Sequence, residues 1–534
     1  MLHGHHLIAG ARSADARPTL RATDPASGEP LNPAFAEATP GEIDRALQRA
    51  EAAFRADRRQ PAETRAALLD AVASEIEALG DALVDRATAE TGLPAGRIQG
   101  ERGRTCGQLR LFASVVRDGS WVDARIDTAL PDRQPAARPD LRRMAVALGP
   151  VVVFGASNFP LAFSVAGGDT ASALAAGCPV VVKAHPAHPG TSELVAGAIA
   201  RAVARVGLHA GTFSLVHTAS PERSVDLVTH PLTRAVGFTG SLGAGRALFD
   251  AAAARPDPIP VYAEMGSTNP VVVLDGALAA DGDAIADGLV GSVTLGAGQF
   301  CTNPGVVLGV AGPALDRFAR RVAAGVRETS ALTLLHDGIR RGYDAGVDRW
   351  GDTDGVDLLA HGGDGDHVST ATPARAAVAT VRAETFRQTP ALRDEVFGPA
   401  TLLVQARDAD DLVATVETLG GHLTGTLWGT DDELTDQAAL VAALADRVGR
   451  LIVRGFPTGV EVSPAMQHGG PYPATTDVRS TSVGTAAIER FARPICFQNA
   501  PQALLPPELQ DANPRGVWRL VDGERTRGPL ARAS

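Results

Sequence analysis

The sequence predicts an α/β protein built from two doubly wound, Rossmann-like lobes, each a mainly parallel sheet covered by helices. Three observations lead to this fold class. Strand-like apolar runs alternate with helical runs from residue 149 onward, and a second alternating block begins near residue 275. The chain also has 534 residues, more than one hydrophobic core of ordinary size accommodates.

The N-terminal part of the chain predicts a layer of helices. Thr39, Pro40 and Glu42 form a capping box with a proline at the first helical position. Apolar residues then recur on one helical face, at Ile43, Leu47, Ala50 and Phe54. Further helical stretches are expected at about 61–91 and 100–116.

Apolar, β-branched runs predict the strands of both lobes. In the first lobe they lie at residues 151–154, 180–182, 212–216 and 235–238. In the second lobe they lie at 305–310, 400–405 and 450–453, separated by helical stretches at 313–327, 409–419 and 432–446. We therefore expect residues 1–124 and 144–274 to form one domain and residues 275–455 the other.

The stretch 125–143 is polar and rich in Pro, Asp and Arg. It is either a surface loop or a β arm that reaches another subunit. Together with residues 456–534 it is expected to form an arm and a C-terminal segment outside the two lobes.

Composition excludes several classes of partner. A net charge of −11, without a Lys/Arg run or zinc-finger spacing, gives no reason to expect nucleic acid. The sequence has no apolar run long enough to cross a bilayer and no basic-then-apolar leader, so we expect no membrane partner and a cytoplasmic location. The four cysteines lack the spacing of a disulfide framework, which fits a reducing compartment: Cys106, Cys178, Cys301 and Cys496.

Cys301 is the candidate nucleophile. It follows a run of small residues, 291–298, within the stretch Gly-Gln-Phe-Cys-Thr-Asn-Pro-Gly. A thiolate attacks carbonyl carbon readily, although an isolated cysteine is more often an inert buried thiol. Glu264, in Ala-Glu-Met-Gly-Ser, is the candidate general base that accompanies it.

A glycine-rich turn joins the strand at 235–238 to a helix. Gly240, Ser241 and Gly245 lie in the run Phe-Thr-Gly-Ser-Leu-Gly-Ala-Gly. Backbone N–H groups at such a helix start could meet a pyrophosphate. The spacing differs from Gly-x-Gly-x-x-Gly, so a simple tight turn is the alternative.

Six segments occur in an order that resembles the aldehyde dehydrogenase superfamily over nearly the whole chain. They are Ser157–Pro160, Val182–Lys183, Phe238–Ser241, Glu264–Gly266, Gly298–Cys301 and Glu395–Pro399. The resemblance implies that Cys301 attacks an aldehyde and that the Asn158 amide and the Cys301 N–H hold the oxyanion. It also implies a thioester that water, activated by Glu264, hydrolyses to a carboxylic acid.

The same resemblance implies a nicotinamide cofactor in the first domain and catalysis in the second. Lys183 would bind the adenosine ribose, Glu395 the nicotinamide ribose, and Phe397 would pack beside the nicotinamide. The alternatives are a solvated strand end, a surface carboxylate and a core aromatic, respectively. Many NAD-preferring members have glutamate where this chain has Pro186, so we expect NADP, with NAD possible.

Longer matches resemble NADP-accepting members that act on α-ketoglutaric semialdehyde (2,5-dioxopentanoate). They lie at 156–190, 455–462, 468–475 and 481–490. The expected reaction is oxidation of that semialdehyde to 2-oxoglutarate. The alternatives are aliphatic aldehydes or another semialdehyde, and a catalytically silent binding homologue.

Two residues are candidates for substrate binding. Phe159 lies in the first matching segment, and Arg454 could hold the distal carboxylate of the substrate, or could be a structural arginine at a strand end. His185 and His188 lack an acidic or cysteine partner nearby, so no metal site is expected. The arm and a strand near 493–498 imply a homodimer or homotetramer by the same resemblance.

Overall fold

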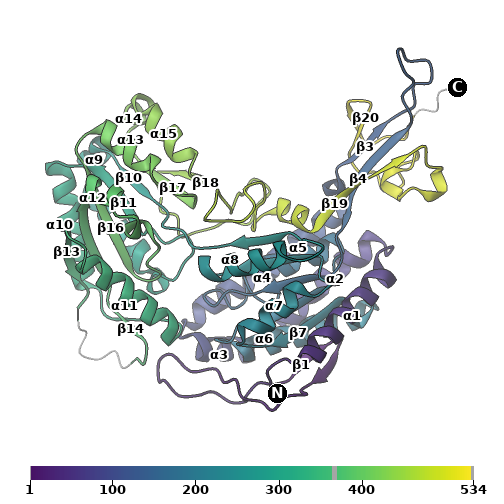
Figure 1. Cartoon of the computed structure of the whole chain (residues 1–534), viewed down its shortest axis with the longest axis horizontal. Helices are drawn as coiled ribbons and strands as arrows, with labels where there is room; N and C mark the ends of the chain where they lie inside the picture. Colours follow the sequence, from purple (N-terminus) through teal and green to yellow (C-terminus); the bar gives the residue numbers. More distant parts are fainter. Residues whose placement is uncertain (1, 364–369, 531–534) are drawn as a thin grey trace.

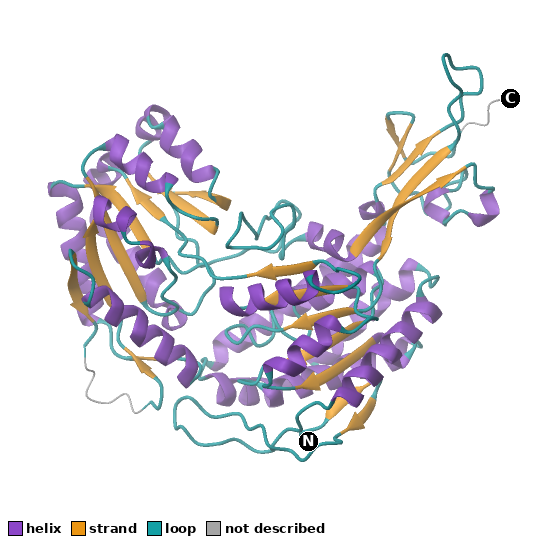
Figure 2. Cartoon of the chain, viewed as in Figure 1, coloured by secondary structure: helices purple, strands orange, loops and turns teal. Residues whose placement is uncertain are grey.

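The computed structural model describes residues 2–363 and 370–530, which form two lobes and a projecting arm (Figure 1). Helices cover both faces of the main sheet in each lobe (Figure 2). The N-terminus lies at the foot of the first lobe, and the C-terminus lies at the arm. No helix in the described part of the chain is long and apolar enough to cross a membrane.

The first lobe contains a seven-stranded sheet in the order β2-β1-β7-β6-β5-β8-β9. Its strands are β1 (His6–Ile8), β2 (Ala11–Ser13), β5 (Val151–Phe154), β6 (Val180–Ala184), β7 (Phe213–His217), β8 (Ala235–Thr239) and β9 (Val261–Glu264). Strands β5 to β9 are parallel, and β1 pairs antiparallel with β7 at the edge. This confirms the four predicted strands; β9 and the short edge pair β1 and β2 were not predicted.

Eight α-helices surround this sheet in the described residues: α1 (Pro40–Asp57), α2 (Ala62–Glu77), α3 (Gly80–Thr91), α4 (Ala95–Asp118), α5 (Gly168–Ala176), α6 (Pro189–Val206), α7 (Pro221–Thr229) and α8 (Leu242–Ala253). The capping box is present, since the Thr39 hydroxyl accepts from the Glu42 N–H at 3.2 Å. The helix expected at 61–91 is two helices, because α2 ends at Glu77 and the chain turns at Gly80, whose left-handed φ of 57° interrupts the helical path before α3 continues.

The second lobe contains a seven-stranded sheet in the order β13-β15-β16-β11-β10-β17-β18. Its strands are β10 (Val271–Val273), β11 (Val306–Val310), β13 (Val356–His361), β15 (Ala377–Arg382), β16 (Ala400–Ala406), β17 (His422–Trp428) and β18 (Val448–Val453). Only β13 runs antiparallel to its neighbour among these described strands. A separate pair joins β12 (Leu332–Thr333) to β14 (Pro373–Ala374).

Its helices are α9 (Asp275–Thr294), α10 (Pro313–Glu328), α11 (Asp337–Gly351), α12 (Ala383–Gln388), α13 (Ala409–Glu417), α14 (Asp431–Asp436) and α15 (Ala438–Ala445). The expected boundary at residue 275 differs from this arrangement, because β10 pairs with β11 and β17 inside the second sheet. The sequence of β10, three valines after Pro270, does not indicate to which of the two sheets this strand belongs. The chain therefore crosses between lobes after β9.

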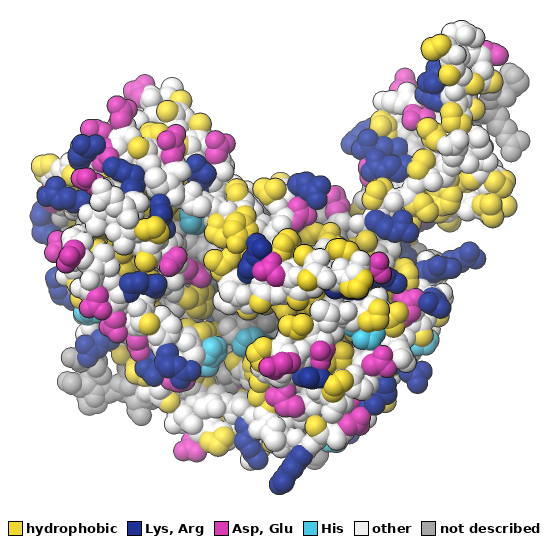
Figure 3. All heavy atoms as spheres, in the orientation of Figure 1, with side chains coloured by type: hydrophobic (Ala, Val, Ile, Leu, Met, Phe, Trp, Pro, Cys, Tyr) yellow, Lys and Arg dark blue, Asp and Glu magenta, His cyan; other side chains and the backbone are white. Residues whose placement is uncertain are grey.

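The arm is a five-stranded sheet in the order β19-β4-β3-β20-β21. It consists of β3 (Ala124–Asp127), β4 (Leu141–Ala147), β19 (Ala492–Gln498), β20 (Arg519–Val521) and β21 (Glu524–Thr526). Strands thus flank the 125–143 stretch, and β4 extends beyond it to Ala147. Val122, Ile126, Met144 and Leu509 form a small apolar cluster here, and apolar side chains gather on the lower part of the arm (Figure 3).

Short 3-10 turns complete the fold: η1 (Ser120–Val122), η2 (Ala210–Thr212), η3 (Leu295–Gly298), η4 (Pro390–Arg393), η5 (Thr485–Phe491), η6 (Gln502–Leu504) and η7 (Pro507–Leu509).

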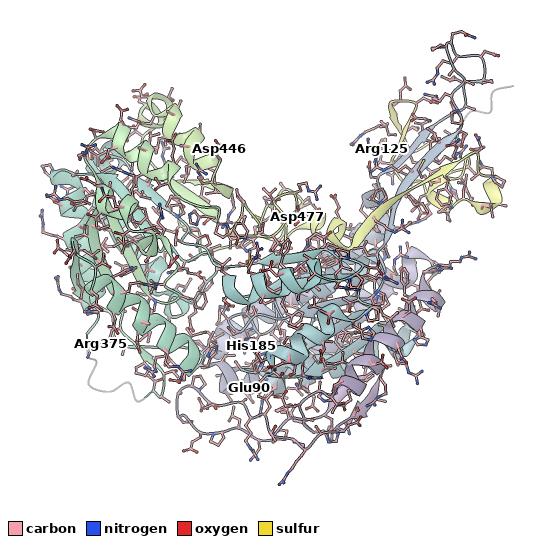
Figure 4. All side chains as sticks on the ribbon, viewed as in Figure 1. Glu90, Arg125, His185, Arg375, Asp446 and Asp477 are labelled. Atoms are coloured by element: carbon pink, nitrogen blue, oxygen red, sulfur yellow. The ribbon has the colours of Figure 1, made fainter. Side chains whose placement is uncertain are left out.

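Residues 454–491, here called the returning segment, run from the second lobe back to the first. The Met265 N–H donates to the Ala474 carbonyl at 2.8 Å, and the Thr476 N–H donates to the Ala263 carbonyl at 3.1 Å. Asp477 marks this segment above the first lobe, and Arg125 marks the arm (Figure 4). These bonds place the returning segment against the end of β9.

The returning segment is also fixed by a buried ion pair. Arg490 donates to Asp169 of α5 at 2.6 Å, and the two side chains are 4% and 10% exposed. Removing one partner would leave a buried charge without compensation, which costs more than the pair itself contributes.

We predict that Arg490→Met lowers the free energy of unfolding by about 3–5 kcal/mol. The matched control is Arg201→Met, which breaks an exposed pair with Glu75 (2.7 Å) and should cost less than about 1 kcal/mol. Urea unfolding of both variants measures the difference. Equal, small effects would contradict the structural role assigned to Arg490.

Candidate active site

Cys301 lies in a tight loop between η3 and β11. Gly298 has φ of 67°, and a Cβ there would stand 2.2 Å from the Gly398 carbonyl oxygen, so only glycine fits. The Asn269 amide donates to the carbonyls of Cys301 and Asn303, both at 2.9 Å. The loop is therefore held from two sides, and the thiol has a fixed position.

Glu264 is the last residue of β9 and lies beside this loop. Its carboxylate is 3% exposed; one oxygen is 3.0 Å from His468 Nε2, and the other accepts from the Ser482 hydroxyl at 2.5 Å. His468 Nε2 is in turn 3.6 Å from the Cys301 sulfur. Three separate parts of the chain therefore meet at one point: β9, the Cys301 loop and the returning segment.

Electrostatics keep the carboxyl charged and the thiol neutral. Burial and the neighbouring Glu264 charge raise the pKa of Cys301 well above its ordinary value. Burial also acts to raise the pKa of Glu264, but the charge and hydrogen bond of His468, with the Ser482 hydroxyl, outweigh it and lower that pKa. The resting pair is a protonated thiol beside a carboxylate.

Asn158 lies in the loop after β5 and contacts the backbone of the Cys301 loop. Its amide nitrogen donates to the Gln299 carbonyl at 2.9 Å, two residues before Cys301. An asparagine amide carries two N–H donors, so one remains for another acceptor. The structure thus brings together all three predicted catalytic residues: Cys301, Glu264 and Asn158.

The predicted phosphate-binding turn joins β8 to α8. Ser241 is the N-cap of α8, and its hydroxyl accepts from the Ala244 N–H at 3.4 Å. Gly240 and Ser241 are exposed, whereas Gly245 is buried, and a Cβ on Gly245 would stand 2.7 Å from Met265. The first N–H groups of α8 have no partner within the helix and face outward at an exposed helix start.

Lys183 lies near the end of β6, and Pro186 follows it in the next loop. Burial lowers the pKa of Lys183 to about 8, against the opposing charge of Glu37. Glu37 is a neighbour that the sequence did not indicate; its oxygens accept from the Ala219 N–H at 3.1 and 3.2 Å.

Glu395 and Phe397 come from the second lobe, after η4. Glu395 accepts from the Ser267 N–H at 3.2 Å, and burial raises its pKa to about 7. Phe397 lines a small recess with Glu395 and Ser267. Glu395 is thus neither a free surface carboxylate nor an ion pair in the described part of the chain.

A pocket of about 380 Å³ opens beside Cys301. Phe159 lines it and meets the rings of Phe163 and Phe300, each at 5.3 Å in an edge-to-face geometry. A larger cavity of about 970 Å³ lies at the base of the arm, and none of the predicted catalytic residues lines it. Phe159 and Cys301 therefore line the same pocket.

Arg454 lies outside this pocket. Its backbone is left-handed, with φ of 54°, and its guanidinium donates to the Gly429 carbonyl at 2.8 Å and to Asp431 at 2.5 Å. The side chain is 44% exposed and does not line the pocket. The structural alternative for Arg454 is the one that this geometry supports.

His185 lies on the side of the first lobe that faces the second (Figure 4), and His188 lies close to it in the same loop. Their rings stack at 5.4 Å, and His185 also stacks on His336 of the second lobe at 6.2 Å. Histidine side chains are visible in the hollow between the lobes in Figure 3. His188 Nε2 is 2.9 Å from the Ala156 carbonyl, a structural contact.

Several residues of the site carry no recognisable signal in the sequence. His468 and Ser482 lie in stretches quoted only for their resemblance, and neither has a motif that signals contact with Glu264. Asn269 also looks like an ordinary loop residue in sequence. A carboxylate oxygen of Glu264, the sulfur of Cys301 and a ring nitrogen of His468 lie within 4.8 Å of one another. These residues are 37 and 167 positions apart in the sequence, so their proximity cannot be read from the chain.

Comparison with known proteins agrees with this geometry. The family model described as "Aldehyde dehydrogenase family" matches residues 12–472. The chain is 54% identical to alpha-ketoglutaric semialdehyde dehydrogenase 2 of Azospirillum brasilense and 45% identical to alpha-ketoglutaric semialdehyde dehydrogenase of Acinetobacter baylyi. Each alignment covers 98% of this chain and 99% of the relative.

Solved structures share the fold. Betaine aldehyde dehydrogenase of Staphylococcus aureus, in a complex with NAD+, superposes with a TM-score of 0.79 at 19% identity, covering 94% of this chain and 98% of that one. Aldehyde dehydrogenase C of Pseudomonas syringae, with NAD+ and octanal, gives 0.78 at 20% identity, covering 93% and 97%. The chain belongs to the aldehyde dehydrogenase family, and its two relatives with 54% and 45% identity are dehydrogenases of one semialdehyde.

We predict that Glu264→Gln speeds alkylation of Cys301 by iodoacetamide at pH 7 in the cofactor-free protein. The amide removes the negative charge that raises the thiol pKa, so that pKa falls, more of the thiol is the reactive thiolate, and the alkylation rate should rise by roughly three- to tenfold. Peptide mass spectrometry in a Cys496→Ser background measures the rate, because Cys496 is exposed. Slower alkylation would show instead that Glu264 deprotonates the thiol.

Proposed function

We propose that this protein oxidises α-ketoglutaric semialdehyde (2,5-dioxopentanoate) to 2-oxoglutarate with a nicotinamide cofactor. One observation carries the chemistry: a cysteine thiol 3.6 Å from a histidine nitrogen that is itself 3.0 Å from a buried carboxylate. The substrate assignment is supported by the names of the relatives that are 54% and 45% identical over nearly the full chain.

Cys301 is the nucleophile in this proposal. Its thiol gives its proton to solvent water, and the sulfur bonds to the aldehyde carbon as the C=O π electrons move to the oxygen, which gives a thiohemiacetal anion. The remaining N–H of the Asn158 amide and the Cys301 backbone N–H stabilise the negative oxygen. A bound nicotinamide supplies an acceptor for the hydride that leaves this carbon, which becomes a thioester carbon.

Glu264 then activates water. Its lowered pKa keeps it ionised near neutral pH, so it is ready to accept a proton from water that attacks the thioester. The products are the carboxylic acid and the Cys301 thiol. His468 and Ser482 hold the two oxygens of Glu264 and orient the carboxylate toward the sulfur.

The groups proposed for cofactor binding fit a dinucleotide. The exposed start of α8 offers N–H groups to a pyrophosphate, Lys183 offers a donor to the adenosine ribose, and Glu395 an acceptor to the second ribose. Phe397 offers an apolar face for the nicotinamide. Pro186 favours NADP, because it places no carboxylate against a 2′-phosphate. Glu37, whose charge acts on Lys183, favours NAD instead, because a carboxylate repels a 2′-phosphate.

The remaining assignments follow the same reasoning. In our proposal the first lobe binds the cofactor and the second supplies the nucleophile. The arm assembles a homodimer or homotetramer through its exposed strands. A silent homologue is disfavoured, because a binding protein has no use for a nucleophile, a base and an oxyanion donor at one point.

The test is steady-state turnover of α-ketoglutaric semialdehyde, succinic semialdehyde and pentanal, each with NADP+ and with NAD+. We expect kcat/KM for the keto-semialdehyde to exceed that for pentanal by at least about tenfold, a difference of about 1.4 kcal/mol, with NADP+ the better cofactor. Cys301→Ser should lose at least about 10⁴-fold in kcat.

Cys496→Ser is the matched control and should keep full activity, because this thiol is exposed on the arm. Preference for pentanal would move the assignment to aliphatic aldehydes. Full activity of the Cys301 variant would overturn the proposed mechanism.

A further inference from the structure

Three charged residues of α4 border the pocket beside Cys301: Arg97, Glu101 and Arg104. Their spacing of four and three residues places them on one face of the helix. Two positive groups thus accompany one negative group at the wall of the catalytic pocket. The partners of each side chain within the protein determine which of these three charges is available to bind a ligand.

Glu101 has its hydrogen-bonding capacity occupied. One oxygen accepts from the N–H groups of Leu161 and Ala162 at 2.8 and 2.9 Å, and the other lies 3.0 Å from Arg97. Glu101 is 4% exposed, so these bonds replace water. Arg97 and Glu101 therefore neutralise each other.

Arg104 is left without such a partner. It forms no hydrogen bond or ion pair within the described residues, and its Nη1 is cut off from solvent with no acceptor. Its guanidinium lies over the Phe163 ring, 5.2 Å from the centroid. A guanidinium stays charged in proteins, and although the Glu101 carboxylate attracts it, a shielded nitrogen without a hydrogen-bond acceptor is costly.

Other arginines near the site are already committed. Arg450 donates to the carbonyls of Pro457 and Gly459, both at 2.9 Å, which fixes the start of the returning segment. Arg454 pairs with Asp431 at the surface. Among the arginines of this region that the structure describes, Arg104 combines a place on the pocket wall with a terminal nitrogen that lacks an acceptor.

We propose that Arg104 binds the carboxylate at the far end of the substrate while the aldehyde carbon meets Cys301. This inference rests on the proposed function and specifies how its substrate class is recognised. The pocket volume, about 380 Å³, falls in the usual range for small-molecule sites of about 300–1,000 Å³. Phe159 and Phe300 line the same pocket and offer apolar walls to a short methylene chain.

The charge of Arg104 also acts on the Cys301 thiol, and that effect predicts a different substrate dependence. Its positive charge acts to lower the pKa of Cys301, against the larger effects of burial and Glu264. A residue that only stabilised the thiolate would affect every aldehyde alike. A residue that binds the carboxylate affects only substrates that carry one.

The experiment compares Arg104→Met with the unaltered protein on two matched aldehydes, succinic semialdehyde and its methyl ester, and on α-ketoglutaric semialdehyde. Loss of a charged hydrogen bond should lower kcat/KM for both acids by roughly 10- to 150-fold, mainly through KM. The methyl ester should change less than about threefold. Arg104→Lys should recover part of the loss, because lysine keeps the charge but not the planar fork.

Arg110→Met is the matched control, since Arg110 lies on the same helix but pairs with Glu77 at the surface. It should leave all three substrates unchanged. Equal losses of kcat/KM for the acids and the ester in Arg104→Met would show that Arg104 acts on the thiolate. A loss of kcat/KM for the acids in Arg97→Met but not in Arg104→Met would show that Arg97 binds the carboxylate. Either outcome overturns the proposal.

A measurement on the unaltered protein guards against a variant that fails to fold. Pentanoate should inhibit competitively against the semialdehyde at least about tenfold better than pentanamide, which has the same shape without the charge. Equal inhibition would exclude a carboxylate subsite. If the unaltered protein prefers acid semialdehydes but Arg104→Met keeps that preference, the inference about Arg104 fails and the proposed function stands.

Discussion

The site depends on one buried carboxylate, Glu264, held between His468 and the Ser482 hydroxyl beside the Cys301 thiol. A buried carboxylate without partners would take up a proton and lose its use as a base. The two bonds from the returning segment prevent this, because they lower the Glu264 pKa despite burial. The same negative charge raises the thiol pKa, so nucleophile and base are coupled, and neither is set independently.

This coupling explains why the returning segment crosses from one lobe to the other. Residues 454–491 supply both partners of Glu264, and their backbone bonds to Ala263 and Met265 fix the register of β9 against them. The ion pair between Arg490 and Asp169 anchors the far end of the segment. On the opposite side, Asn269 and Gly298 fix the Cys301 loop. Each lobe thus contributes one half of the site, and the returning segment closes it.

The parts of the fold that have local signals are predictable from the sequence. The capping box at Thr39 and the buried valine runs of β5 and β6 each report their own structure. Prediction from sequence fails where the signal is not local. β10 is a short strand, and the sheet to which it belongs is decided by its pairing with β11 and β17. Arg454 is a candidate for substrate binding only by its position in the chain, and its contacts in the fold are structural. His468 and Arg104 carry no motif, since their importance arises from the groups that the fold places around them.

The most direct test of the central claim is a rapid-quench measurement of Glu264→Gln with one turnover of α-ketoglutaric semialdehyde and NADP+. Our account predicts a burst of NADPH close to one per active site and a long-lived acyl adduct on the Cys301 peptide, because hydride leaves normally while hydrolysis of the thioester lacks its base. Absence of an adduct together with normal steady-state turnover, or an adduct on another cysteine, would contradict it.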